Sequence, residues 1–232
     1  MRKIKTILRY ITLAICLFLL AQSVAAQDAD FEFDVSALPD KDQEKRKENL
    51  YIEYLVEIPV NAAIHCFDVN SKGMYVLCFD QSTHKTIGVY SATGELQYGL
   101  RIRCEGICAV QLSEQDGLSV YLDRSHLLAV FDADGKCLRI SEVPLTSHNR
   151  ELADTLIYRT QKQNNGQTYR LERDLPLGPG YSRLVVVDEN GVKIVLYDVS
   201  LQQNLRIILV SAFFITVMFL SVYNAFVKRR AY

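Results

Sequence analysis

The middle of the chain alternates short apolar stretches with turn residues. From Leu50 onward, runs rich in Val, Ile, Tyr and Leu are separated by Gly, Asp, Asn and Ser. Short runs of β-branched and aromatic residues with such boundaries are typical of antiparallel strands. The pattern predicts an all-β fold, an antiparallel β-meander over residues 50–200, followed by one C-terminal transmembrane helix.

A turn motif recurs three times in this region. It consists of an apolar pair, then Ser or Asp, two further residues and Gly, at residues 91–94, 132–135 and 188–191. The Ser or Asp oxygen accepts a backbone hydrogen bond in such a turn, and Gly takes the positive φ that other residues avoid. The motif therefore predicts three hairpins. Residues 132–135 also resemble the start of a calcium loop, but Val143 stands where that loop needs Glu.

Extension outward from the hairpins gives three sets of four predicted strands. The first set is residues 63–69, 74–80, 85–91 and 96–102. The second set is residues 107–112, 118–122, 127–131 and 136–140. The third set is residues 155–159, 168–172, 183–188 and 192–197. Gly73, Gly117 and the pair Asn165-Gly166 mark the first turn of each set, and residues 50–58 offer one additional outer strand.

The hairpin motif and the spacing of the repeats resemble the blades of NHL-type and related β-propellers, over about residues 63–197. The resemblance implies propeller-like units of four antiparallel strands. Three units are fewer than the four to eight blades of a closed propeller. Three arrangements stay open: an open stack of small sheets, a ring completed by another copy, and another β-meander or sandwich.

A second apolar run, residues 207–227, contains no charged residue. A helix of about 20 apolar residues crosses the hydrocarbon core of a bilayer. The hydroxyls within it, such as Thr216 and Ser221, are tolerated because they bond a carbonyl one turn back. Three basic residues begin the tail at 228–232, so the C-terminus is predicted to be cytoplasmic and the residues before Arg206 outside.

Residues 1–26 have the three regions of a secretory signal: basic residues, an apolar run at 11–20, and small residues that end at Ala26. Cleavage after Ala26 is favoured over an uncleaved anchor, which would still leave the middle domain outside. Residues 27–49 are highly charged and are expected to form a mobile leader with room for a short helix. The chain is therefore predicted to be a single-pass protein of the cell membrane with an extracytoplasmic β domain.

The distribution of charge excludes one class of partner. The whole chain carries a net charge of −1, and seven positive charges lie at its two ends, so the remainder carries −8. Binding to nucleic acid needs Lys and Arg gathered on one face. No nucleic-acid partner is therefore expected.

Five cysteines remain once Cys16 leaves with the signal, and an odd number cannot all pair within one chain. Cys104 and Cys108 flank a loop that contains Gly106 and are a candidate bridge. The favoured alternative is that most of the five are small buried hydrophobes inside strands. They are Cys66, Cys78, Cys104, Cys108 and Cys137.

The sequence predicts no catalytic, cofactor-binding or metal-ligating residues and no cofactor. His65, His84, His126 and His148 have no metal-ligand spacing, and they are expected in a strand, two turns and a loop. The preferred hypothesis is a membrane-anchored extracytoplasmic interaction or scaffold protein. It would contact the bilayer through residues 207–227 and a protein partner or a second copy through its first or third set of strands. The alternative is an extracytoplasmic, hydrolase-like enzyme with an unrecognised site.

Overall fold

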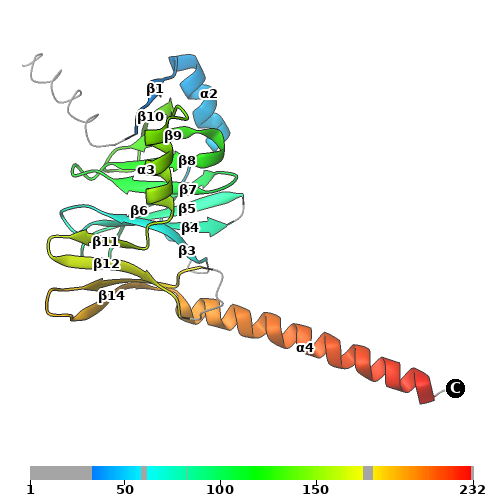
Figure 1. Ribbon diagram of the computed structural model, residues 1–232. Coiled ribbons are helices and arrows are strands. Elements are labelled where there is room, and N and C mark those ends of the chain that lie inside the picture. Colours follow the sequence, from blue (N-terminus) through cyan, green and yellow to red (C-terminus); the bar gives the residue numbers. More distant parts are fainter. Residues whose placement is uncertain (1–32, 59–61, 82, 175–179, 231–232) are drawn as a thin grey trace, which may run out of the picture.

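The computed structural model describes residues 33–58, 62–81, 83–174 and 180–230. In this part of the chain, three antiparallel sheets stack on one another and a long helix leaves the stack at one end (Figure 1). The predicted signal at residues 1–26 lies outside the described residues.

Sheet 1 is built from the first predicted set of strands and has the order β2-β6-β5-β4-β3. The additional outer strand predicted within residues 50–58 is confirmed as β2, which pairs with β6. The strands of sheet 1 are β2 (Glu53–Leu55), β3 (Ile64–Val69), β4 (Tyr75–Gln81), β5 (His84–Tyr90) and β6 (Leu96–Arg103).

Sheet 2 is built from the second set and has the order β1-β10-β9-β8-β7. Its strands and the short 3-10 helix between β8 and β9 are β1 (Ser36–Ala37), β7 (Cys108–Leu112), β8 (Leu118–Leu122), η1 (Asp123–Ser125), β9 (Leu127–Phe131) and β10 (Cys137–Glu142). From residue 33 onward, the segment expected to be a mobile leader is folded. It supplies β1 and all but the last residue of helix α2 (Asp40–Leu50), the short helix for which the leader had room, and Phe33 is buried.

Sheet 3 has the order β11-β12-β13-β14. Its strands are β11 (Gln161–Asn164), β12 (Gln167–Glu172), β13 (Arg183–Val187) and β14 (Lys193–Asp198). The prediction of a strand at residues 155–159 is wrong, because helix α3 (Ser147–Ile157) occupies most of that segment and the first strand of the set is β11.

Helix α3 forms for reasons of capping and periodicity. Thr146 is its N-cap, and the hydroxyl accepts a hydrogen bond from the Asn149 N–H at 3.1 Å. Its buried residues recur at helical spacing and pack on the outer face of sheet 2. This burial outweighs the β-branched Thr155 and Ile157, whose strand preference underlies the mistaken prediction. The buried residues of α3 are Asn149, Ala153, Leu156 and Ile157.

The sheets stack in the order 2, 1, 3, so sheet 1 lies in the middle (Figure 1). One core fills the space between sheets 1 and 2, a second fills the space between sheets 1 and 3, and a third lies between sheet 2 and α3. Each unit contains four antiparallel strands paired in chain order, and no sheet closes on itself within the described residues. The third unit packs on the first, whereas blades that follow one another along a chain normally pack in sequence.

The three predicted hairpins are confirmed, with positive φ of 90° at Gly94, 80° at Gly135 and 79° at Gly191. In the second hairpin, Oδ1 of Asp132 accepts the N–H groups of Asp134 at 3.1 Å and Lys136 at 2.8 Å. Ser91 and Asp188 accept the same two bonds in their own turns. The aspartate oxygen is thus engaged in the turn, in agreement with the preference for a hairpin over a calcium loop.

Helix α4 (Ser200–Arg230) contains the predicted apolar run at residues 207–227. Residues Ser200–Ser221 are a candidate membrane span with a mean hydropathy of 2.0, and the apolar window has no buried residue. Thr216 and Ser221 donate their hydroxyls to the carbonyls of Ala212 and Val217, both at 2.8 Å, as expected for hydroxyls in lipid. The described residues therefore contain one candidate transmembrane helix, near the C-terminus.

Substitution of two hairpin glycines distinguishes the cost of backbone strain from the cost of a steric clash. An added Cβ at Gly191 meets nothing within 4 Å, whereas at Gly135 it lies 2.6 Å from the ring of Tyr98. We expect Gly191→Ala to lower the free energy of unfolding by about 1–2 kcal/mol through its positive φ alone. Gly135→Ala should cost roughly 1–3 kcal/mol more, because the ring must move. Urea unfolding of the full chain in detergent measures both, and equal losses would contradict this account.

Candidate functional site

Asp68 is a fully buried carboxylate at the place where the three sheets meet. It lies in β3 of sheet 1, and its Oδ2 accepts the N–H of Leu112 in sheet 2 at 2.9 Å. Its Oδ1 accepts hydrogen bonds from Lys162 in sheet 3 at 2.7 Å and from Arg159 just before that strand. The two cations neutralise a charge that would otherwise be very costly to bury, so this residue holds one strand from each sheet.

The first turns of the sheets meet next to Asp68. The side chain of Asn70 accepts the N–H groups of Lys72 and Met74, both at 3.1 Å, and donates to the Ser113 carbonyl at 3.2 Å. From sheet 3, Asn164 donates to the Asn70 carbonyl at 2.7 Å. The polar groups at this end are thus used to fix the sheets relative to one another.

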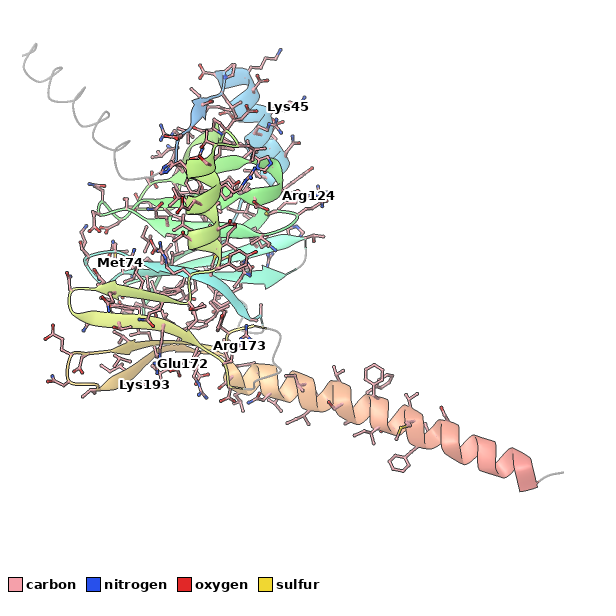
Figure 2. All side chains as sticks on the ribbon, in the orientation of Figure 1. Lys45, Met74, Arg124, Glu172, Arg173 and Lys193 are labelled. Atoms are coloured by element: carbon pink, nitrogen blue, oxygen red, sulfur yellow. The ribbon has the colours of Figure 1, made fainter. Side chains whose placement is uncertain are left out.

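A shallow pocket of about 280 Å³ lies at the opposite end of β3. Its lining includes His65, Arg159, Arg173 and Tyr181, and the guanidinium of Arg173 lies 4.7 Å from the ring centroid of Tyr181. Figure 2 places Arg173 beside the start of α4. The cationic lining suits a small anion, but Arg159 already pairs with Asp68.

The outer face of sheet 3 is charged. Glu172 in β12 pairs with Arg170 at 2.7 Å and with Lys193 at 2.5 Å (Figure 2). The hydrogen bond from Lys193, and a second from Arg170, lower the pKa of Glu172 below its usual 4.5. Arg183 bonds Asp198 at 2.9 Å on the same sheet. This face is therefore solvated, whereas α3 covers the outer face of sheet 2.

The edge of sheet 3 formed by β14 is apolar and open. Val192 just before β14 and Ile194 and Val195 within it, hereafter the β14 edge, are 55%, 55% and 48% exposed. In sheets 1 and 2 a short fifth strand pairs with the outer side of the fourth strand of the set. These fifth strands are β2 beside β6 and β1 beside β10. Within the described residues, β14 has β13 on one side and no strand on the other.

The structure distributes the histidines over separate elements. His65 lies in β3, His84 begins β5 and His126 follows η1. His148 lies in helix α3, so its placement in a loop is wrong. Among the described residues, the group of three or more potential metal ligands is instead formed by Cys66, Cys78 and Cys108.

The predicted burial of cysteines is confirmed for four of the five. Cys66, Cys78, Cys104 and Cys108 are buried, and Cys137 is partly exposed. Cys104 and Cys108 are not bonded to each other, and the short sulfur contact is between Cys78 and Cys108. The Cys66–Cys78 pair was within reach of sequence reasoning, because the predicted turn at Gly73 sets the first two strands of the first set, and with them these two residues, opposite each other. The approach of Cys108 depends on how the sheets stack.

Comparison of the sequence with models of protein families and with curated proteins finds no match to either. Function must therefore be argued from the geometry of this chain.

Removal of the Asp68 carboxylate tests its role in joining the sheets. Asp68→Ala leaves Arg159 and Lys162, with side chains 18% and 31% exposed, without their carboxylate. We expect the free energy of unfolding to fall by about 3–5 kcal/mol, as for other broken buried pairs. The matched control is Glu53→Ala, which breaks the more exposed pair with Arg101 and should cost less than about 1 kcal/mol. Equal losses in urea unfolding would show that Asp68 does not join the sheets.

Proposed function

We propose that the protein is a membrane-anchored interaction protein, that its β domain lies outside the cell membrane, and that two copies associate through the β14 edge. The single observation that carries this proposal is the open edge of sheet 3. Sheets 1 and 2 each gain a fifth strand from the segment before β3. Within the described residues, sheet 3 has no such fifth strand and ends at the apolar strand β14.

The length and chemistry of β14 support this proposal. An edge strand presents a row of N–H and C=O groups that can pair with another chain, and proteins normally blunt such edges. The outermost strands β1 and β2 span only two and three residues, whereas β14 spans six. Ile194 and Val195 lie near the middle of β14 and offer apolar side chains for contact with a further strand.

The position of the anchor favours a second copy as the occupant. Asp198 ends β14 and Ser200 begins α4, so the edge is tied to the membrane-spanning helix by one residue. Every copy in one membrane therefore holds its β14 edge at the same height. Confinement to a plane raises the effective concentration, so a weak edge contact suffices.

The orientation is proposed from the basic residues that follow the apolar run. Lys228, Arg229 and Arg230 favour a cytoplasmic C-terminus, which places sheets 1 to 3 on the other side. The alternative of an extracytoplasmic enzyme stays a hypothesis that no observation on the described residues favours.

Site-directed cross-linking tests the proposed contact. In a Cys137→Ser background, Ile194→Cys should give a cross-linked dimer when intact cells receive a short, membrane-impermeant bis-maleimide. The matched control is Gln163→Cys, which places the thiol on β11, the opposite edge of the same sheet. It should stay monomeric.

Labelling of the same control variant with an impermeant maleimide reports the orientation separately. Gln163→Cys should be labelled on intact cells, and protection of this thiol would contradict the extracytoplasmic location. A labelled Gln163→Cys together with no dimer from Ile194→Cys, or equal dimer from both variants, would contradict the β14 contact. Ile194→Lys should weaken the dimer in detergent by about tenfold or more, because it sets like charges side by side.

A further inference from the structure

Three cysteine side chains meet in the core between sheets 1 and 2. Cys66 in β3 and Cys78 in β4 stand opposite each other in the hairpin register. Cys108 is the first residue of β7 in sheet 2. The three sulfur atoms lie within 4.8 Å of one another, and all three side chains are fully buried.

The contacts within this cluster are unequal. The Sγ atoms of Cys78 and Cys108 are only 3.1 Å apart. Cys66 instead donates its S–H to the backbone carbonyl of Cys108 at 3.4 Å. Cys66 therefore has a backbone acceptor, while Cys78 and Cys108 face each other across the space between the two sheets.

The surroundings favour an uncharged state of the cluster. The core around it is lined by aliphatic side chains such as Val76, Ile87 and Val110. Hydrogen bonding with Cys108, together with burial, raises the pKa of Cys66 well above its usual value, and the pKa values of Cys78 and Cys108 are raised as well. The positive charge of Lys85 acts in the opposite direction on Cys78 but does not reverse the shift.

Burial and the hydrogen bond of Cys66 distinguish between metal binding and disulfide formation, the two kinds of chemistry open to three thiols. A copper(I) or zinc ion would need three thiolates and would leave one or two net negative charges in an apolar core. It would also take the proton that Cys66 shares with the Cys108 carbonyl. A disulfide carries no charge and leaves that hydrogen bond intact.

We propose that Cys78 and Cys108 are joined by a disulfide bond in the exported protein and that Cys66 keeps its thiol. This inference rests on the proposed extracytoplasmic location, since disulfides persist in oxidising compartments. It does not depend on the β14 contact.

The bond forms by thiol–disulfide exchange with the disulfide of an exported dithiol oxidase. One cysteine thiolate attacks that disulfide to give a mixed disulfide and release one oxidase thiolate. The second cysteine thiolate displaces the other oxidase sulfur. Two electrons pass from the two cysteines to the oxidase, which leaves as a dithiol, and the two protons of the cysteine thiols end on the oxidase sulfurs. Because the folded thiols are buried with raised pKa values, exchange takes place before sheets 1 and 2 close over the sulfur atoms.

The consequence is a covalent tie between two sheets that are otherwise held by the packing of their faces and by hydrogen bonds such as that from Leu112 to Asp68. The bond closes a loop between residues 30 apart in the sequence, and it joins β4 of sheet 1 to β7 of sheet 2. A closed loop of this size restricts the unfolded chain and so stabilises the folded one.

Peptide mapping of the full chain from the membrane fraction tests the proposal directly. The protein is unfolded without reductant, alkylated and digested with trypsin. We expect a species that links residues 73–85 to residues 104–124, with Cys104 in the second peptide alkylated. Cys66 and Cys137 should also be alkylated in this step. The linked species should disappear on reduction.

Three other results would overturn the proposal. Alkylation of both Cys78 and Cys108 without reductant, in protein whose orientation has been verified through Gln163→Cys, excludes the bond. A link that involves Cys66, or one between Cys104 and Cys108, assigns it elsewhere. A stoichiometric zinc or copper ion that is lost in Cys66→Ser identifies a metal site instead.

Thermal unfolding with and without reductant gives a second measurement. Reductant should lower the unfolding midpoint of the natural sequence by about 5–10 °C. The midpoints of Cys78→Ala and Cys108→Ala should not respond to reductant, whereas that of Cys66→Ala should respond as the natural sequence does. A response that survives in Cys78→Ala would contradict the proposal.

Discussion

The buried carboxylate of Asp68 is the contact through which three separate sheets become one structure. Apolar faces pack without strong directional preference, so stacking alone permits sheets to slide or rotate on one another. Asp68 removes this freedom because it accepts hydrogen bonds from the backbone N–H of Leu112 in sheet 2, from Lys162 in sheet 3 and from Arg159. Arg159 lies just before β11, the strand that contains Lys162. A buried ion pair adds little net stability compared with an apolar core. Its value here lies in fixing the order and register of the stack.

The same arrangement determines which surfaces stay available. Sheet 1 is covered on both faces by the other sheets, and α3 covers the outer face of sheet 2. Sheet 3, the unit next to the candidate transmembrane helix, keeps a charged outer face and an open apolar edge. The sequence predicts association through the first or third set of strands, and of these two the third, sheet 3, has the open apolar edge.

Local chemistry explains why much of the fold was predictable from sequence. The Ser or Asp and the Gly of each hairpin are needed by the turn itself, so the motif located the turns and, through them, the strands of sheets 1 and 2. Helix α3 was missed because its stabilising contacts are with sheet 2, while Thr155 and Ile157 resemble strand residues. The role of residues 33–49 was missed for a related reason. Because α2 is mostly polar, its sequence does not indicate that Phe33 before it and Leu50 at its end are buried in the cores.

The parts that depend on stacking could not be derived in this way. Asp68 stands between Phe67 and Val69 in a predicted strand, and a charge in such a strand indicates burial with a partner. Nothing in the sequence identifies Arg159 and Lys162 as those partners. The contact between Cys108 and Cys78 could not be predicted either, because it depends on how sheets 1 and 2 stack.

Amide hydrogen exchange in lipid nanodiscs that hold one or two copies of the full chain tests the central claim, that β14 is the edge through which copies associate. The outward-facing N–H groups of β14 should exchange more slowly in two-copy discs than in one-copy discs, and those of β11 should not change. Equal exchange of β14 in both preparations, or protection that appears at β11 instead, would contradict the account.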